Sequence, residues 1–208
     1  DRNFDENQVE EFVKNPNNYL GVNPLLKDGD TTTVGEAILS DKVIVVKRYN
    51  ITSLGKWITH LLTPSRAYRC WKNATMLLLL GLNTPRPYLF MEERRFWIIR
   101  LRAYFLSEKV HSENLTDQLS SKNESIDISD LVEAFENFFS VMDSYQISHG
   151  DMKATNFIFL NGSLYILDLD SMKRHRFRWW AKRKHLSDIK RFEKNWRGGA
   201  YEDIFAPL

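Results

Sequence analysis

Two oxygen-bearing side chains, Asn156 and Asp168, flank a predicted hairpin in the second half of the chain. The apolar segments FIFL and SLYIL enclose the pair Asn161-Gly162, the dipeptide that best tolerates the positive φ angles of a tight turn. Asn156 lies five residues before Asn161, and Asp168 lies six residues after Gly162. Pairing of the two strands around this turn therefore returns both side chains to the same open end.

The chemistry that this spacing favours is metal-assisted. A carboxylate and an amide oxygen at one end of a hairpin suit Mg²⁺, which binds few protein groups together with phosphate oxygens. Asp151, five residues before Asn156, supplies a further carboxylate. Phosphoryl transfer needs positioning and charge neutralisation more than covalent help from the protein. The three residues therefore predict a magnesium-dependent phosphoryl-transfer site. The alternative is that they only form turns and caps, positions that Asp and Asn favour in any protein.

The first half of the chain predicts a mostly β unit with one helix. β-branched residues dominate two segments on either side of Ser40-Asp41, a pattern typical of a hairpin. Thr63 before Pro64 indicates a capped helix start, and Gly81 indicates its end. The expected elements are strands at Thr31–Leu39, Lys42–Tyr49, Tyr88–Glu92 and Phe96–Leu106, and a helix over Pro64–Leu80.

The second half predicts helices around the hairpin. A helix is expected over Ser129–Tyr145, and its apolar residues recur at three- and four-residue steps: Leu131, Phe135, Phe138, Phe139 and Met142. A last helix is expected over Ser187–Trp196, with a serine cap and an apolar row of Ile189, Phe192 and Trp196. The polar stretch Ser112–Ser125 predicts a loop or flap.

Composition predicts a folded protein with a real core. The 208 residues are 43% apolar and 27% charged, and the formal net charge is only +2, so neither a disordered chain nor a general nucleic-acid binder is expected. The longest aliphatic stretch, Met76–Leu80, is too short to cross a bilayer, and the first residues are polar, so no export signal or span is expected. Cys70 is the single cysteine; it fits a reducing compartment and is expected to be a small buried residue on a helix.

One segment has a marked charge asymmetry. Lys173–His185 reads KRHRFRWWAKRKH, with seven Lys or Arg, two His, two Trp and no acidic residue. It predicts either a solvated face or a surface that binds something, and Trp179 and Trp180 favour the second. A nucleic-acid-binding module would rest on this segment alone.

The sequence HGDMKATN, followed by ILD, resembles the catalytic loop and metal-binding segment of protein-kinase-like enzymes. The resemblance implies an α+β, two-lobed fold, with a β-rich N-lobe over residues 1–106 and a mainly helical C-lobe over 107–208 that contains the catalytic hairpin. It implies ATP and Mg²⁺ as cofactors. Asp151 would accept the hydroxyl proton, Lys153 would contact the transferred phosphate, and Asn156 and Asp168 would hold the metal.

The same resemblance assigns residues of the first half to the nucleotide. Lys47, in VIVVK, matches the third-strand lysine that holds the α- and β-phosphates. The segment Ser107–Val110 would be the hinge that receives adenine. The cofactor-binding residues implied in this way are Lys47, Gly29, Val34, Glu108 and Val110.

Within that superfamily the chain resembles the lipopolysaccharide core kinases, the Kdo and heptose kinases of Gram-negative bacteria. The resemblance runs from about Leu26 to Trp196 and rests on VVKRYN, SRAYRCWKNA, GLNTPRP, HGDMKATN and ILDLD. It implies a sugar hydroxyl of the inner core as acceptor, a lipid-linked substrate, and work at the cytoplasmic face of the inner membrane. The segment Lys173–His185 would then contact anionic substrate or lipid headgroups.

The sequence departs from the protein-kinase pattern in four places. The glycine-rich loop is reduced to Lys27-Asp28-Gly29 and Val34-Gly35. The first predicted helix has no acidic residue to pair with Lys47, a role that Glu92 or Glu93 could take. Gly150 replaces an arginine, and Asp168-Leu169-Asp170 replaces Asp-Phe-Gly. No phosphorylation switch is therefore expected.

Two residues and two functions stay open at this point. His149 is expected to be a buried structural residue rather than a catalytic one. Asp170 is either a second metal ligand or a supporting residue. The alternative functions are a phosphotransferase for a soluble alcohol, such as an aminoglycoside or choline, and a pseudokinase or scaffold.

Overall fold

The computed structural model describes residues 4–20, 25–50, 63–96, 99–121 and 126–205 of the 208-residue chain. The chain forms two compact units. The first contains Asp1–Thr75 and Pro85–Val110, and the second contains Met76–Thr84 and His111–Leu208. The chain therefore enters the second unit for one short segment, returns to the first, and leaves it after Val110. The sequence predicted a single boundary between residues 106 and 107.

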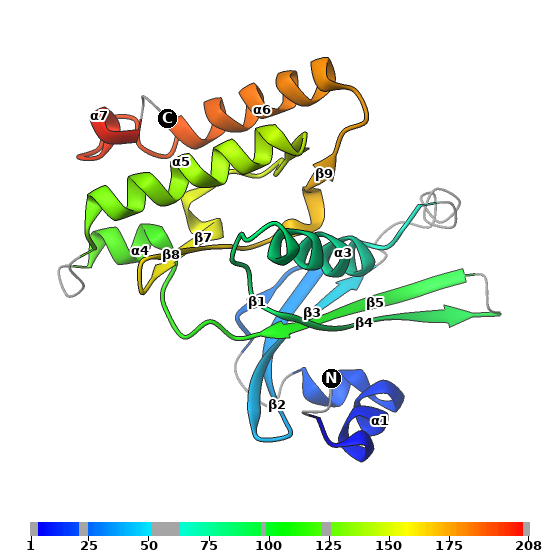
Figure 1. Cartoon of the computed structure of the whole chain (residues 1–208). Coiled ribbons are helices and arrows are strands. Elements are labelled where there is room, and N and C mark those ends of the chain that lie inside the picture. The colour runs from blue at the N-terminus through cyan, green and yellow to red at the C-terminus, as the bar shows by residue number, and fades with distance from the viewer. Residues whose placement is uncertain (1–3, 21–24, 51–62, 97–98, 122–125, 206–208) are drawn as a thin grey trace. The chain divides into compact units, whose positions relative to one another are not determined.

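The first unit is built on an antiparallel five-stranded sheet with the order β1-β2-β3-β5-β4 (Figure 1). Ser40 and Asp41, which connect β2 and β3, have φ values of 51° and 60°, so the predicted hairpin turn is confirmed. The strands are β1 (Lys27–Asp28), β2 (Thr32–Leu39), β3 (Lys42–Asn50), β4 (Pro87–Arg95) and β5 (Ile99–Glu108).

Helical segments cover the two faces of this sheet. On one face, Phe12 of α1 (Glu6–Lys14) packs with Ile44, Val46 and Leu106; the short 3₁₀ helix η1 (Pro16–Tyr19) follows α1. On the other face, Cys70 of α3 (Arg66–Leu79) is buried, as predicted, and its Sγ lies 3.1 Å from the hydroxyl of Tyr49. The alternation of side chains along β3 sorts its residues between these faces.

The start of α3 differs from the prediction, whereas its end agrees. Ser65, not Thr63, caps the helix, because the Ser65 Oγ accepts a hydrogen bond from the backbone N–H of Tyr68 at 3.0 Å. Pro64 consequently lies before the helix instead of in its first turn. At the other end Gly81 has a φ of 79°, and the N–H of Leu82 donates to the Leu77 carbonyl at 3.0 Å, which closes the helix.

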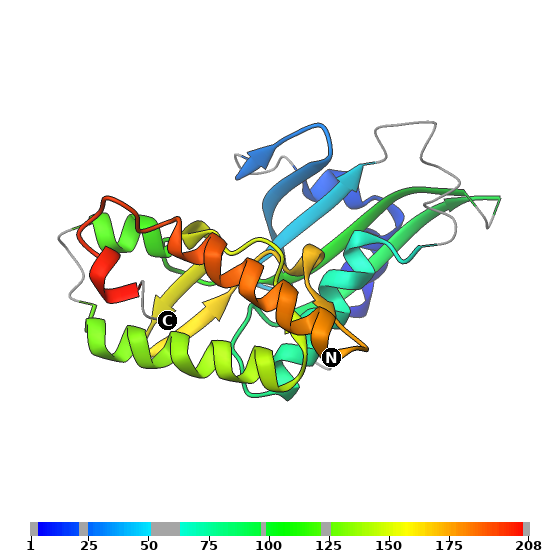
Figure 2. The same ribbon diagram turned by 90° about the horizontal axis from the view of Figure 1, so that it is seen from above.

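The second unit packs helices around a two-stranded hairpin. Helices α5 and α6 lie side by side, and their aromatic residues meet in the core, where the rings of Phe135 and Phe192 are 4.6 Å apart (Figures 1 and 2). The predicted apolar face of α5 is buried throughout. The elements are α4 (Leu115–Ser120), α5 (Ile128–Ser144), β6 (Ile147–Ser148), η3 (Ala154–Asn156), β7 (Phe157–Leu160), β8 (Ser163–Ile166), η4 (Leu169–Ser171), β9 (Lys173–Arg174), α6 (Arg178–Glu193) and α7 (Glu202–Phe205).

The prediction of a loop over Ser112–Ser125 is wrong for its central part, which is α4. The helix is short, and Asn114 caps it by accepting hydrogen bonds from the N–H groups of Thr116 and Asp117. Its Gln118 is buried, and its side-chain amide exchanges two hydrogen bonds with the backbone of Phe159, at 2.7 and 3.0 Å. A polar residue that docks through hydrogen bonds leaves no apolar periodicity in the sequence.

The last long helix begins earlier than predicted. Helix α6 starts at Arg178, nine residues before the expected start, so Ser187 lies inside the helix instead of capping it. Ala181, Asp188 and Phe192 are the helix residues that are buried. Arg and Lys are good helix formers but give no hydrophobic signal, which is why the first turns were missed.

Candidate active site

The hairpin brings Asn156 and Asp168 to one end, as the turn predicted. Phe157 pairs with Ile166, and the turn residues Asn161 and Gly162 have φ values of 52° and 72°. One step beyond the ladder, the N–H of Leu167 donates to the carbonyl of Asn156 at 2.8 Å. Asn156 and Asp168 therefore leave the hairpin next to each other.

Asp168 has an unusual backbone conformation. Its φ and ψ are 54° and 61°, the left-handed region, which an Asp side chain tolerates better than most others do. The residue lies two positions after the end of β8 and is the N-cap of η4. Left-handed non-glycine residues cost about 1–3 kcal/mol and concentrate at functional sites.

Asp151 is the centre of a cluster that includes two of the predicted residues. The Asn156 Nδ2 donates to the Asp151 backbone carbonyl at 2.9 Å and to its Oδ2 at 3.3 Å. The Lys153 ammonium lies 3.2 Å from the same Oδ2. From α6, the Arg191 Nη1 lies 3.8 Å from Oδ1. The carboxylate is about a quarter exposed, so it is fixed by its neighbours and still open to a substrate.

The donor set fits magnesium. Since Asn156 uses its amide nitrogen on Asp151, its Oδ1 is the atom that remains for a cation, and the Asp168 carboxylate leaves the same end of the hairpin. One amide oxygen and one carboxylate are the few hard ligands that Mg²⁺ needs beside phosphate oxygens. Among the described residues, no group of three or more His, Cys, Asp or Glu could hold a metal ion. Asp170 is buried and accepts a hydrogen bond from the Ser171 hydroxyl at 3.1 Å.

His149 is a structural residue, as predicted. Its ring is fully buried, and its Nδ1 accepts the backbone N–H of Asp151 at 3.3 Å. The proton is therefore on Nε2, which donates to the carbonyl of Leu167 at 3.0 Å. Burial lowers the pKa of His149 and keeps the ring neutral. The imidazole thus ties the loop before Asp151 to the chain just before Asp168.

Sequence reasoning missed the residues of α6, and of the turn after it, that hold the loop around Asp151. The buried Asp188 carboxylate accepts the N–H of His149 at 2.6 Å and the N–H of Gly150 at 3.0 Å. Arg191 donates to the Gly150 carbonyl, and the Asn195 Nδ2 donates to the Met152 carbonyl at 2.8 Å. Asp188 and Arg191 are three residues apart on α6, so they lie on one face of that helix, and Asn195 lies in the turn that follows it. The helical spacing of these polar residues was the signal in the sequence that could have identified them. Only the apolar row of Ile189, Phe192 and Trp196 in the same segment was interpreted.

Gly150 is required by the same geometry. Its φ is +84°, and a Cβ at this position would lie 3.1 Å from the carbonyl oxygen of Ser171. A side chain would therefore be strained by the backbone and by a rigid neighbour.

In the first unit, the structure pairs two of the residues expected to bind nucleotide. Val34 lies directly opposite Lys47, which in turn lies opposite Phe105. Opposed residues share a face, and alternation along β3 places Lys47 on the same face as Tyr49, the face that α3 covers. Gly29 lies in a tight turn, exchanging backbone hydrogen bonds with Thr32 at 3.1 and 3.2 Å.

The predicted hinge lies at the end of β5. Glu108 exchanges hydrogen bonds with the backbone of Arg86, and the half-buried Val110 is the last residue of the first unit. The two carboxylates considered as partners of Lys47 contact other groups: Glu92 pairs with Arg94, and Glu93 accepts the Tyr104 hydroxyl at 2.7 Å. Desolvation by burial and that hydrogen bond raise the pKa of Tyr104 to about 12. A contact of either with Lys47 stays a prediction.

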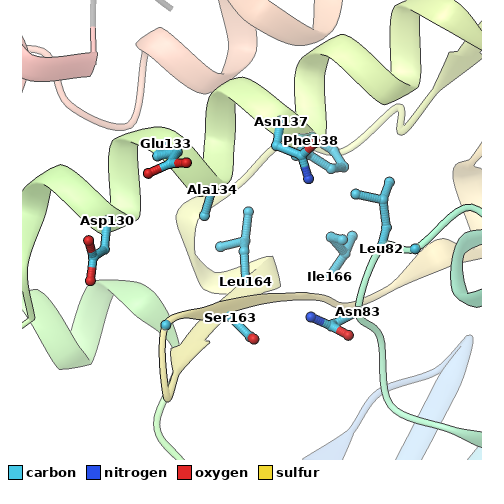
Figure 3. Close-up of a pocket in the computed structure, with 12 residues that line it drawn as sticks. Leu82, Asn83, Asp130, Glu133, Ala134, Asn137, Phe138, Ser163, Leu164 and Ile166 are labelled. Carbon is cyan, nitrogen blue, oxygen red and sulfur yellow. The ribbon is translucent and has the colours of Figure 1, made fainter.

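A separate cavity of the second unit does not contain the predicted catalytic residues. Figure 3 shows it between α5 and the hairpin, with Asp130, Glu133 and Asn137 on the helix side. Ser163 and Ile166 line the hairpin side. Asp151, Asn156 and Asp168 are not among its lining residues, so this cavity is distinct from the predicted site.

The fold and this loop define a protein-kinase-like phosphotransferase. The first unit is an antiparallel sheet with a lysine on its third strand, and the second supplies an Asp-x₄-Asn loop and a hairpin that ends in Asp. A solved structure described as "WaaP in complex with acyl carrier protein" matches with a TM-score of 0.61 at 14% identity, over 82% of this chain and 69% of that chain. The predicted fold class is thereby confirmed.

The chain belongs to the lipopolysaccharide kinase (Kdo/WaaP) family. The model of that family matches residues 50–205, well over half of the chain. It is accordingly a kinase, with ATP as the phosphoryl donor and a sugar hydroxyl as the acceptor. No curated protein sequence matched. A search of the described residues found no helix with the length and apolarity that crossing a bilayer requires.

Proposed function

We propose that this kinase phosphorylates a hydroxyl of Kdo or heptose in the inner core of lipopolysaccharide. The observation that carries the proposal is the cluster around Asp151, with Lys153 and Asn156 in contact with its carboxylate and Asp168 at the adjacent hairpin end. If these residues only formed turns and caps, their side chains would not need to meet around one carboxylate. The family match supports a lipopolysaccharide acceptor, and the particular sugar is our proposal.

Each residue of the cluster has a proposed role. Asp151 accepts the proton of the attacking hydroxyl, because it is a partly exposed carboxylate held in position by Asn156. Lys153 is mostly exposed and can move from Asp151 to a phosphoryl oxygen as charge develops there. Asn156 Oδ1 and Asp168 would hold Mg²⁺, which supplies neutralisation of the triphosphate charge.

The nucleotide is proposed to use the first unit. Lys47 would bind the α- and β-phosphates, with Val34 opposite it on the neighbouring strand and Gly29 in the turn that precedes that strand. Glu108, the last residue of β5, and Val110, two residues beyond it, would contact the adenine through their backbone.

We further propose that the enzyme works at the cytoplasmic face of the inner membrane on a lipid-linked substrate. The support is the segment Lys173–His185, in which Phe177 and Trp179 are 58% and 66% exposed beside exposed cations. Binding to vesicles that contain anionic lipid, measured with and without the substitution Trp179→Ala, tests this contact. Because the solved WaaP is in complex with acyl carrier protein, binding to acyl carrier protein instead of vesicles would change the assignment of this surface.

The experiment that tests the function measures phosphate transfer from ATP with Mg²⁺ to purified inner-core lipopolysaccharide and to its Kdo and heptose fragments. Wild-type protein is expected to transfer phosphate, and Asp151→Ala is expected to bind nucleotide without transfer. Transfer to a soluble aminoglycoside or choline instead would keep the fold and change the acceptor. Failure of the wild type both to transfer phosphate and to bind ATP would favour a pseudokinase.

A further inference from the structure

The solvent side of α6 and the turn that follows it form a groove lined by cations. Arg183, Lys190 and Lys194 recur at helical spacing along one face, and Arg191 and Arg197 line the same groove. All five are exposed. We call these five residues the α6 basic groove.

The groove has a large excess of positive charge. Glu193 is the one carboxylate among the described residues that line it. The other acidic residue of α6, Asp188, is buried and bound to the backbone of the catalytic loop. In the described part of the chain, no carboxylate forms an ion pair with Lys190 or Lys194. The groove therefore presents cations that a ligand can bind.

One end of the groove reaches the residue proposed to accept the proton. Arg191 lines the groove, donates to the Gly150 carbonyl and lies 3.8 Å from the Asp151 carboxylate. All of these residues belong to the second unit, so their spacing is fixed within one compact body. A sugar whose hydroxyl reaches Asp151 would have its neighbouring groups within reach of Arg191 and then Lys190.

From this placement, and resting on the proposed function, we infer that the α6 basic groove is an acceptor subsite for a negatively charged group of the glycan. That group is a carboxylate or a phosphate next to the hydroxyl that is phosphorylated. Guanidinium groups such as Arg191 match both oxyanions bidentately, and the lysines add attraction along the groove. The enzyme would thus select acceptors that already carry negative charge, in contrast to a phosphotransferase for cationic alcohols.

The test uses steady-state kinetics of the whole protein on a soluble, deacylated inner-core oligosaccharide in three forms: intact, with its carboxylates reduced to alcohols, and with its phosphates removed. For Lys190→Gln/Lys194→Gln we expect KM for the intact acceptor to rise roughly fivefold to thirtyfold, the range for two exposed charge contacts, with kcat nearly unchanged. The matched control, Lys14→Gln/Lys42→Gln, removes two exposed lysines of the first unit and is expected to leave KM unchanged.

The modified acceptors identify the charged group. If the groove binds the carboxylate, the wild type should have a higher KM for the carboxyl-reduced acceptor, and Lys190→Gln/Lys194→Gln should raise that KM no further. If the groove binds phosphate, the phosphate-free acceptor should have these two effects instead. An equal rise in KM for charged and uncharged acceptors, or no rise at all, overturns the inference.

Direct binding separates this inference from the proposed function. If the wild type transfers no phosphate to any glycan, calorimetric titration of the intact oligosaccharide still decides the question. Binding that weakens in Lys190→Gln/Lys194→Gln and at high salt supports the subsite, because exposed charges are screened by salt. Absence of binding, or binding that neither change affects, contradicts it.

Discussion

The loop around Asp151 and the strands that carry Val34 and Lys47 are held in position by different means. In the first unit, Lys47 and Val34 are placed by a regular antiparallel ladder, in which any strand-forming residue could stand. In the second unit, the loop before Asp151 has almost no regular structure, and side chains bind its backbone: Asp188 from α6 and the buried ring of His149. The loop should therefore depend on a few individual residues, and the sheet should not.

The largest expected effect is at Asp188. Asp188→Ala leaves the N–H groups of His149 and Gly150 without their acceptor, and each lost hydrogen bond to a charged group costs about 1.5–3 kcal/mol. Thermal and denaturant unfolding measure the loss. Asp188→Asn, which keeps one acceptor oxygen, should recover part of the stability and less of the transfer rate. Equal behaviour of Asp188→Ala and the wild type would remove the basis of the comparison.

Gly150→Ala should be the next largest, with a matched control in the hairpin turn. Both Gly150 and Gly162 have positive φ, but a Cβ at Gly162 meets nothing within 4 Å whereas at Gly150 it meets the Ser171 carbonyl at 3.1 Å. Gly162→Ala is expected to cost about 1 kcal/mol and Gly150→Ala about 2–3 kcal/mol, with a fall in kcat only for the second. Similar costs at the two sites would show that the contact with Ser171 relaxes.

Lys47→Gln tests the same comparison in the first unit, where a regular strand holds the residue. The residue is half-buried on a regular strand, so its replacement should change the free energy of unfolding by less than about 1 kcal/mol. Its proposed contact is with the nucleotide phosphates, so KM for ATP should rise about tenfold or more. A large loss of stability without an effect on ATP would mean that Lys47 supports the fold.

The smallest expected effect is on pH dependence and comes from His149. Because burial lowers its pKa below the ordinary 6.5, the unfolded chain takes up a proton below that pH which the folded ring does not accept. The free energy of unfolding should therefore fall as pH drops below 6.5, by at most about 1.4 kcal/mol per pH unit. Burial also lowers the pKa of His175, so the difference between wild type and His149→Gln isolates the first residue. Parallel pH curves would contradict the assignment.

How much of this could be predicted from the sequence depended on whether a residue left a periodic or turn signal. The Asn161-Gly162 turn and the apolar face of α5 did so, and they gave the hairpin and the core correctly. The first turns of α6 did not, because Arg and Lys form helix without a hydrophobic pattern. Asp188 was missed for a related reason: a carboxylate that caps a distant backbone segment looks like any polar helix residue.

In the candidate site too, the features with a spacing or turn signal were predicted from the sequence and the others were not. The Asp-to-Asn spacing of the loop and the position of Asp168 after the turn predicted the cluster around Asp151. The left-handed backbone of Asp168 and the positive φ of Gly150 were not predictable, because both depend on contacts that the chain makes only when α6 and η4 are in place.

The measurement that tests the central claim most directly is the Mg²⁺ dependence of ATP binding and phosphate transfer in wild type and Asp168→Asn. The account predicts that Mg²⁺ strengthens ATP binding and enables transfer in the wild type. Asp168→Asn should lose most of that dependence and transfer at least about a hundredfold more slowly, while keeping its fold. Wild-type Mg²⁺ dependence and transfer in Asp168→Asn would contradict a phosphoryl-transfer site at the open end of this hairpin.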